Sequence, residues 1–256
     1  MEKNKTLLYN YHTHTIFCDG KNTPEEMVEK AIELGLSSIG FSGHSYTDFS
    51  DEWCMSPNGT KQYKNEINRL KEKYKNKIEI LLGVEQEYFS KEPTDDYEYV
   101  IGAVHYVLKN VKYLSVDDSR QTQIDIVNNF YGGDFYAFVE DYYALVGDVY
   151  NKTKCDIIGH FDLITKFNAY GSLFDTNNPR YIAAWKSAAD KLIATPAVFE
   201  VNTGGIARGY TKTPYPEKSI IDYLKKNGVR LIYSSDCHDK NYLLFEYDKV
   251  MELIGD

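Results

Sequence analysis

Short apolar runs alternate with amphipathic segments along the whole chain. Seven runs are rich in Ile, Val, Leu and Tyr and are bounded by Gly or polar residues, which is typical of buried parallel strands. They cover residues 6–14, 37–44, 77–88, 99–107, 155–163, 197–204 and 229–238. The pattern therefore predicts seven strands.

Helical patterns fill the intervals between these runs. A capping box at Thr23, followed by proline, opens a helix that Gly35 closes. Residues 119–152 predict one or two helices, with the break at Gly132-Gly133. Further helices are predicted over 60–76, 179–194, from Pro216 to Gly228, and over 241–254.

This alternation predicts an α/β fold with a parallel sheet and helices outside it. Six of the seven runs carry a histidine or an acid at or near their carboxyl end. A (β/α) barrel collects functional residues from the carboxyl ends of all its strands, whereas a doubly wound open sheet binds ligands at one switch point. The spread of candidates favours the barrel. With 256 residues and no internal linker, the chain 1–256 is expected to form a single domain.

Composition narrows the function classes. A net charge of −9 argues against a general nucleic-acid binder. No apolar run approaches the roughly 18 residues of a membrane span, and the N-terminus lacks the apolar core of a signal peptide. The four cysteines form no Cys-x-x-Cys pair, which is typical of free thiols in a reducing compartment. We therefore expect a cytoplasmic protein that binds neither membrane nor nucleic acid.

All six histidines fall at the ends of predicted strands, at positions 12, 14, 44, 105, 160 and 238. His12 and His14 alternate with period two, so both imidazoles should point to one side. Asp236 and His238 repeat that spacing, while Cys237 between them should point away and pack. Glu85 and Glu87 also share it, so alternation does not choose between these two acids.

Nitrogen and oxygen donors without cysteine suit Zn²⁺, Fe²⁺ or Mn²⁺. Taken alone, His105 or His160 would more often be a core histidine, and Asp19 a turn residue. Six such accidents in register are improbable, so we predict a multi-metal hydrolytic centre. The chain has no G-x-S-x-G elbow, Walker A loop or Rossmann glycine fingerprint to indicate another chemistry.

Ordered motifs over essentially the whole chain resemble the histidinol-phosphate phosphatases of the polymerase-and-histidinol-phosphatase (PHP) superfamily. They are HTHT, CDG, FSGHS, GVEQEY, GAVHY, HFDLITKFN, EVNTGGIARGYTKTPYP and SSDCH. The resemblance implies a distorted (β/α)7 barrel with a trinuclear metal site. It also favours Glu85 over Glu87 as a ligand, because the family's ligand follows Gly-x directly.

The resemblance further implies one ligand set for each of three divalent ions. The first set is His12, His14, Glu85 and Asp236. The second is Asp19, His44 and His238, although many superfamily members have histidine at the position of Asp19. The third is Glu85, His105 and His160, with Glu85 bridging to the first. Arg208 matches the family's phosphate-binding arginine, and Lys166 is a second candidate for substrate binding.

The expected activity is hydrolysis of L-histidinol phosphate to L-histidinol and phosphate, the penultimate stage of histidine biosynthesis. A metal-activated hydroxide would attack phosphorus in line, and Arg208 would neutralise phosphoryl oxygens. Asp236, His238 or a metal-bound water would protonate the leaving alkoxide. Alternatives are a PHP phosphoesterase for another small phosphate ester, a PHP nuclease or proofreading domain, and a non-catalytic metal-binding module. The oligomeric state is left open.

Two segments are expected to complete the substrate pocket. Residues 106–143 are rich in Tyr and Asp and would recognise the imidazole and amine of the substrate. Residues 45–60 have the composition of a lid.

Overall fold

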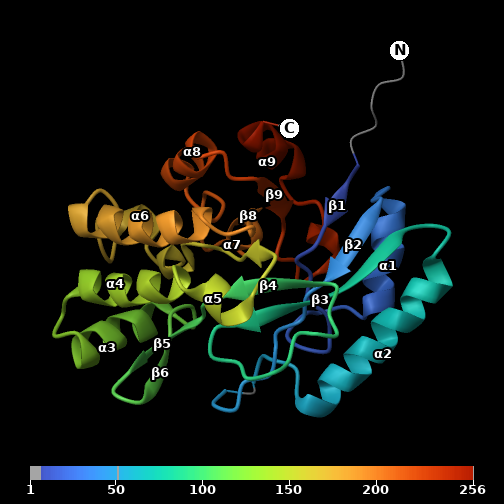
Figure 1. The fold of residues 1–256 in the computed structure, drawn as a ribbon, viewed down its shortest axis with the longest axis horizontal. Helices are drawn as coiled ribbons and strands as arrows, with labels where there is room; N and C mark the ends of the chain where they lie inside the picture. Colours follow the sequence, from blue (N-terminus) through green and yellow to red (C-terminus); the bar gives the residue numbers. More distant parts are fainter. Residues whose placement is uncertain (1–6, 51, 256) are drawn as a thin grey trace.

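The computed structural model describes residues 7–50 and 52–255. Its main sheet contains strands in the order β1-β2-β3-β4-β7-β8-β9, and each strand is parallel to the next. The bounds are β1 Tyr9–Asn10, β2 Ser38–Phe41, β3 Glu79–Glu87, β4 Tyr99–Ala103, β7 Ile157–Ile158, β8 Val198–Asn202 and β9 Leu231–Ser234. Helices lie outside this sheet (Figure 1). The predicted α/β barrel is confirmed, since a doubly wound sheet would reverse its strand order.

The first and last strands meet to bring the sheet almost to closure. Beyond the strand ends, Thr13 and Cys237 form a parallel bridge. The amide of His14 donates to the carbonyl of Cys237 at 2.8 Å, and the amide of Cys237 donates to the carbonyl of His12 at 3.0 Å. Closure therefore occurs at the carboxyl end of the barrel, beside the histidines.

Tyr99, the first residue of β4, fills the barrel interior away from this carboxyl end. Its ring packs where a Cβ on Gly40 or Gly83 would stand, and its hydroxyl donates to the carbonyl of Tyr11 at 2.5 Å. Glycines at these two positions of β2 and β3 let the ring lie directly against the backbone. The interior is thus packed with side chains, and ligands are confined to its mouth.

The strands are shorter than the apolar runs predicted. β7 spans two residues of the nine in the run 155–163. β9 ends at Ser234, and Asp236 adopts φ +46°, a left-handed conformation. A turn therefore brings Asp236 and His238 together, and the pleat assumed from their spacing does not. The run 99–107 divides between β4 and an antiparallel hairpin, β5 Tyr106–Lys109 and β6 Lys112–Ser115.

The helices follow the sequence pattern, with differences in their number and in where some of them begin. Thr23 makes the predicted capping box on the first helix, and Gly132-Gly133 separates two helices. Segment 119–152 holds a third helix, however, because Gly147 ends the second one. The helix predicted from Pro216 begins at Lys218, after Glu217 as its N-cap residue, and the helix predicted over 241–254 begins at Tyr247. The bounds are α1 Pro24–Glu33, α2 Pro57–Tyr74, α3 Arg120–Phe130, α4 Phe135–Val146, α5 Val149–Thr153, α6 Pro179–Ile193, α7 Gly204–Ala207, α8 Lys218–Lys226 and α9 Tyr247–Ile254.

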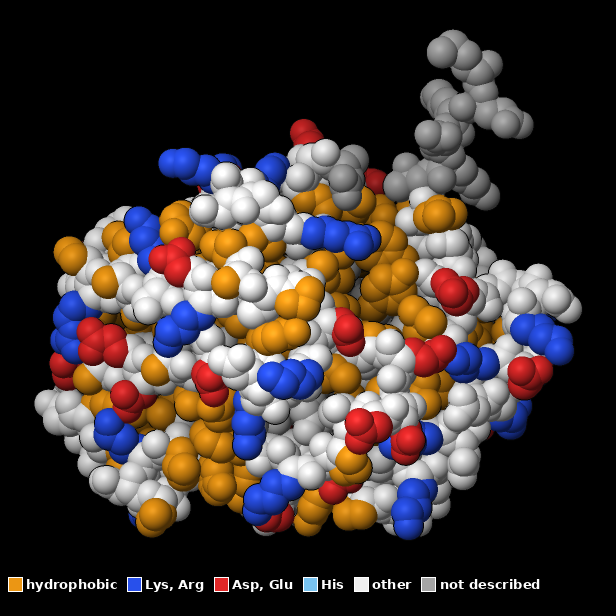
Figure 2. Space-filling view, in the orientation of Figure 1, with side chains coloured by type: hydrophobic (Ala, Val, Ile, Leu, Met, Phe, Trp, Pro, Cys, Tyr) orange, Lys and Arg blue, Asp and Glu red, His pale blue; other side chains and the backbone are white. Residues whose placement is uncertain are grey.

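Acidic and basic side chains are interspersed over the face shown in Figure 2, without a large field of one sign. Within the described residues, no helix combines the length and the apolar character needed to cross a membrane.

Candidate metal centre

The chain segments that follow the barrel strands carry the predicted donors to one place. His12, His14 and Asp236 offer three ligand atoms within 4.8 Å of one another, and all three residues are buried. Glu85 faces the same group, since its Oε2 lies 3.2 Å from His12 Nε2 and 3.5 Å from His14 Nε2. Two donors about 2.1 Å from one ion stand roughly 3.0–3.4 Å apart, so these spacings fit a shared cation.

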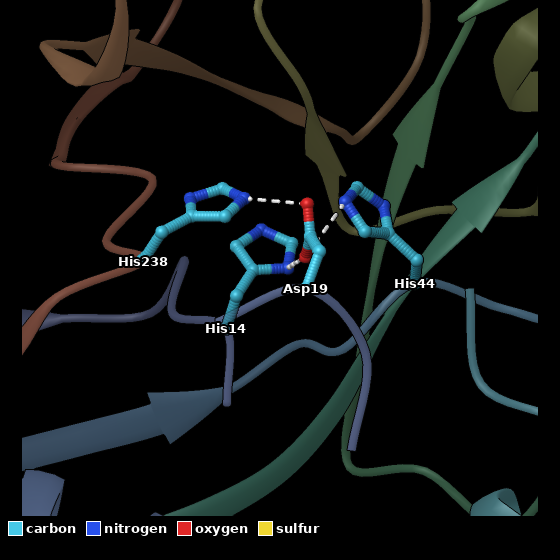
Figure 3. Close-up of side chains that lie close together, drawn as sticks. All are labelled: His14, Asp19, His44 and His238. Atoms are coloured by element: carbon cyan, nitrogen blue, oxygen red, sulfur yellow. Dashed lines mark hydrogen bonds and ion pairs between the residues drawn. The ribbon is translucent and has the colours of Figure 1, made fainter. Parts of the chain in front are cut away.

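A second group forms around Asp19, whose carboxylate is approached by three imidazoles (Figure 3). Its oxygens lie 3.1 Å from His238 Nε2, 3.6 Å from His44 Nε2 and 3.7 Å from His14 Nδ1. The resemblance to the family implies that Asp19, His44 and His238 form one ligand set. The structure brings those three together and adds His14.

The third group has His44, Glu85 and His105 as possible ligands. His160, which was expected here, lies outside that group but has its Nε2 2.8 Å from Glu85 Oε1. His105 Nε2 is 3.4 Å from the same oxygen. Glu85 therefore stands at the centre of the site, with imidazole nitrogens within 3.5 Å from His12, His14, His44, His105 and His160.

The geometry separates the roles of Glu85 and Glu87, which alternation in the sequence leaves open. Glu87 lies behind His105: its Oε2 accepts from the His105 amide at 2.9 Å and lies 2.8 Å from His105 Nδ1. A carboxylate in that position fixes the imidazole tautomer and leaves Nε2 to face Glu85.

Glu200 holds His12 in the same way, although the pattern of the sequence does not mark it as a site residue. Its Oε2 lies 2.8 Å from His12 Nδ1. Its Oε1 accepts from the His160 amide and from the Asn202 side chain, both at 2.7 Å. One feature of the sequence could have identified Glu200 as a site residue. It is an acid inside the apolar run AVFEVN, and a buried carboxylate needs polar partners.

Several donors of the cluster have no hydrogen-bond partner within residues 7–50 and 52–255. They are His12 Nε2, His14 Nε2, His44 Nδ1, His160 Nδ1 and Glu85 Oε2, all buried. Buried polar atoms are rarely left unpaired, because each costs about 1–3 kcal/mol of desolvation. A set of such atoms that includes imidazole nitrogens and a carboxylate oxygen fits divalent cations.

The electrostatics of the cluster also favour positive charge. Burial opposes a charged ring at His12, but the carboxylates of Glu200, Glu85 and Asp236 outweigh it and raise the pKa of His12 well above its ordinary value. By contrast, burial and the neighbouring rings of His238 and His44 lower the pKa of His14 to about 3. The carboxylates thus attract protons that bound cations would displace.

Arg208 reaches the edge of the cluster from the end of α7. Its Nη2 donates to Asp236 Oδ2 at 2.9 Å, and its Nη1 lies 2.9 Å from His238 Nδ1. The guanidinium therefore stands beside two of the predicted ligands. Lys166 contacts Asp117 instead, since its Nζ donates to the backbone carbonyl of Asp117 at 2.8 Å and to its Oδ2 at 3.2 Å.

Cys237 is buried, and its thiol donates to the carbonyl of Asp239. It packs in the core, as predicted, although the left-handed backbone at Asp236 shows that a regular pleat is not the reason. The 45–60 segment places Trp53 against His44 with ring centroids 4.7 Å apart. Residue 51 lies outside the described residues, and closure of this segment as a lid stays a prediction.

Comparisons with known proteins agree with this geometry. Histidinol-phosphatase of Bacillus subtilis is 26% identical over 268 residues, covering 94% of this chain and 97% of its own length. A solved structure from Listeria monocytogenes superposes with a TM-score of 0.80 at 22% identity, covering 94% of this chain and 99% of that one.

Histidinol phosphate phosphatase of Lactococcus lactis, solved with zinc, L-histidinol and phosphate, superposes with a TM-score of 0.72 at 20% identity. The superposition covers 96% of this chain and 92% of that one. The pattern that defines the PHP domain matches residues 10–204, about three quarters of the sequence. The chain therefore belongs to the PHP domain family.

Proposed function

We propose that this protein is a metal-dependent phosphomonoesterase that hydrolyses L-histidinol phosphate to L-histidinol and phosphate. The observation that carries the proposal is the convergence of six imidazoles and three carboxylates at one barrel mouth, with Arg208 at its edge. The similarity to histidinol-phosphatases over nearly the whole chain supports the choice of substrate.

Three divalent ions would be held by the three ligand sets expected from the family, with Glu85 shared between the first and the third. Zn²⁺, Fe²⁺ and Mn²⁺ all suit nitrogen and oxygen donors. Zinc in the Lactococcus lactis structure supports a divalent ion. When bound, such ions lower the pKa of a coordinated water and neutralise phosphoryl charge.

Arg208 would then bind the phosphate. A guanidinium forms two parallel hydrogen bonds with a phosphate, so it both orients the ester and stabilises charge on its oxygens. In the structure its Nη2 contacts Asp236, which faces His12 and His14. A phosphate held by the metal ions would lie within reach of the same guanidinium, whereas Lys166 is bonded to Asp117 and would contact the substrate only after leaving it.

The proton for the leaving alkoxide is best assigned to a water, because His238 would be occupied as a ligand of the second ion. Burial favours a neutral Asp236, but Arg208 and His12 overcome that effect and hold the pKa of Asp236 well below its ordinary range. A carboxyl that stays ionised is a poor general acid. Asp236 is therefore retained as a ligand and as the partner of Arg208.

The chain 1–256 would act as one phosphoesterase domain. The family match ends at residue 204, whereas Arg208, Asp236 and His238 lie beyond it. Since the site is incomplete without these three residues, the C-terminal part belongs to the same functional unit.

The proposal is tested by elemental analysis of the purified protein together with phosphate release from a panel of monoesters. We expect stoichiometric divalent metal and the highest kcat/KM for L-histidinol phosphate. Another ester with a kcat/KM higher by orders of magnitude would replace this substrate. A metal-loaded protein that releases no phosphate from any ester would remove the enzymatic function altogether.

A further inference from the structure

A single buried amide side chain joins two parts of the candidate site. Asn202 is the last residue of β8 and is 0% exposed. Its Nδ2 donates to Glu200 Oε1 at 2.7 Å, and its Oδ1 accepts from the Gly204 amide at 2.8 Å. The side chain therefore connects the carboxylate behind His12 with α7, the short helix that follows β8 and has Arg208 as its C-cap residue (Figure 1).

On the metal side, Asn202 completes the hydrogen bonds of Glu200. Glu200 Oε1 also accepts from the His160 amide at 2.7 Å, while Oε2 lies 2.8 Å from His12 Nδ1. The donors around a buried carboxylate fix where it stands. Without the amide of Asn202, Glu200 would be held by one bond fewer, and it would orient the His12 ring toward a cation less firmly.

On the phosphate side, Asn202 anchors the turn that carries Arg208. The bond from its side chain to the Gly204 amide, two residues on, is an Asx-turn. The carbonyl of the same Gly204 accepts from the Arg208 amide at 3.1 Å. Because a helix of one turn is not stable by itself, its direction depends on such anchors. The position of Arg208 is thus linked to Asn202 through one residue.

The tight packing around Gly204 makes the position of this turn matter. A Cβ at Gly204 would lie 2.8 Å from Asp236 Cβ, 2.9 Å from Asp236 Oδ2 and 3.1 Å from Arg208 Nη2. The backbone of Gly204 therefore packs against the ion pair between Arg208 and Asp236. A small shift of the turn would displace the guanidinium and press on a predicted metal ligand.

The backbone of Asn202 is fixed independently of its side chain. Asn202 and Tyr215 exchange two backbone hydrogen bonds, at 2.6 Å and 2.9 Å. On the other side, Asn202 pairs with Ser234 in the register of β8 and β9. A substitution that changes only the side chain of Asn202 should therefore leave this frame in place.

We infer that Asn202 is a positioning residue that holds Arg208 and His12 in register, so that phosphate affinity and metal affinity both depend on one amide group. The inference rests on the proposed function, because it takes Arg208 as a phosphate ligand and His12 as a metal ligand. Asn202 acts through these residues, since both polar atoms of its side chain are bonded within the protein.

Two substitutions separate the contacts of Asn202. Asn202→Ala removes both, whereas Asn202→Ser keeps a hydroxyl that can accept from the Gly204 amide but is too short to reach Glu200. Calorimetry on the metal-loaded full chain gives the Kd of inorganic phosphate, and chelator competition gives the Kd of the metal. Asn202→Ala should raise each Kd about 2–12-fold, the effect of one hydrogen bond. Asn202→Ser should raise only the Kd of the metal.

A double variant tests whether the effect on phosphate passes through Arg208. If Asn202 only positions Arg208, the two residues act as a unit on phosphate. Asn202→Ala should then change the Kd of phosphate by less than about twofold in the Arg208→Ala background, while its effect on metal affinity persists. An effect on phosphate that is the same with and without Arg208 would overturn the positioning role.

Asn168→Ala is the matched control for a general loss of stability. Asn168 is also buried, and its side chain makes three hydrogen bonds with the backbone of Leu173 and Phe174. The variant should lower the Tm, as Asn202→Ala does, and leave both Kd values unchanged. If Asn168→Ala shifts them as much as Asn202→Ala, destabilisation explains both results and the inference fails.

The outcomes keep the inference and the proposed function apart. If the wild type hydrolyses L-histidinol phosphate and folded Asn202 variants bind metal and phosphate as tightly as it does, the inference is lost and the function stands. If the protein hydrolyses no ester but Asn202→Ala weakens both metal and phosphate binding, the function is lost and the inference stands. Should Asn202→Ala fail to fold, Asn202→Ser decides: an unchanged Kd of the metal overturns the inference.

Discussion

Glu200→Gln tests whether a carboxylate behind a ligand governs metal binding. Glu200 and His12 are each 1% exposed, and the Oε2 to Nδ1 distance is 2.8 Å. A carboxylate can only accept, so His12 donates from Nδ1 and presents the lone pair of Nε2 to the site. Glutamine preserves the volume of the side chain, so the variant changes charge and hydrogen-bond polarity alone.

Either orientation of the new amide creates a conflict. If its NH₂ faces His12, the proton must move to Nε2, and that nitrogen can no longer bind a cation. If its NH₂ faces the other way, it meets the His160 amide and the Asn202 side chain, which are both donors. Loss of such a supporting partner costs about 10–100-fold in metal affinity, or about 1.4–2.7 kcal/mol.

The assay is a metal competition titration against a chromophoric chelator at pH 8, with thermal unfolding to establish that the variant folds. Glu72→Gln is the matched control, because Glu72 is 79% exposed and its nearest charge is Lys75 at 3.2 Å. If a folded Glu200→Gln protein binds metal as tightly as the wild type, the reasoning is refuted. The hydrogen bond between Glu200 and His12 Nδ1 would then have no effect on metal binding by His12.

Three further predictions follow from the same geometry. Glu85→Gln should release metal, because Glu85 faces five imidazoles. It should lower kcat by more than the roughly 100-fold that loss of a residue behind a ligand can cost. Full metal content by elemental analysis would contradict the bridging role of Glu85. Arg208→Ala should raise KM about 10–100-fold while the metal content is retained, as expected for loss of a charged hydrogen bond; loss of metal would show that its role is wrong. Burial raises the pKa of Asp162 to about 8, above the roughly 3.9 of an unfolded chain. The folded state therefore keeps a proton that the unfolded state has released, and stability contributed by this group falls as pH rises from about 4 toward 8, by at most about 1.4 kcal/mol per pH unit. Asp162→Asn should remove that fall, measured by urea unfolding of the metal-free proteins at pH 5.5 and 7.5; equal pH dependence in both proteins would refute the shift.

Local pattern was sufficient for the alternation of elements and for the donors at the strand ends. The capping box at Thr23 and the break at Gly132-Gly133 depend on residues a few positions apart, so the sequence encodes them directly. Local pattern was insufficient to predict strand length. β7 contains only two residues of the run 155–163, because its neighbours in the sheet determine how far it pairs. Local pattern also placed the start of α8 at Pro216, two residues before Lys218.

The sequence by itself predicted seven strands and, near the ends of six of them, side chains that could bind metal, because strand and helix periodicity are properties of neighbouring residues. The tertiary structure decided which acid faces the imidazoles and that Glu200 stands behind His12. Those assignments arise when Thr13 pairs with Cys237 and closes the barrel. Contacts between residues more than two hundred positions apart depend on the packing of the whole chain, and no local pattern contains them.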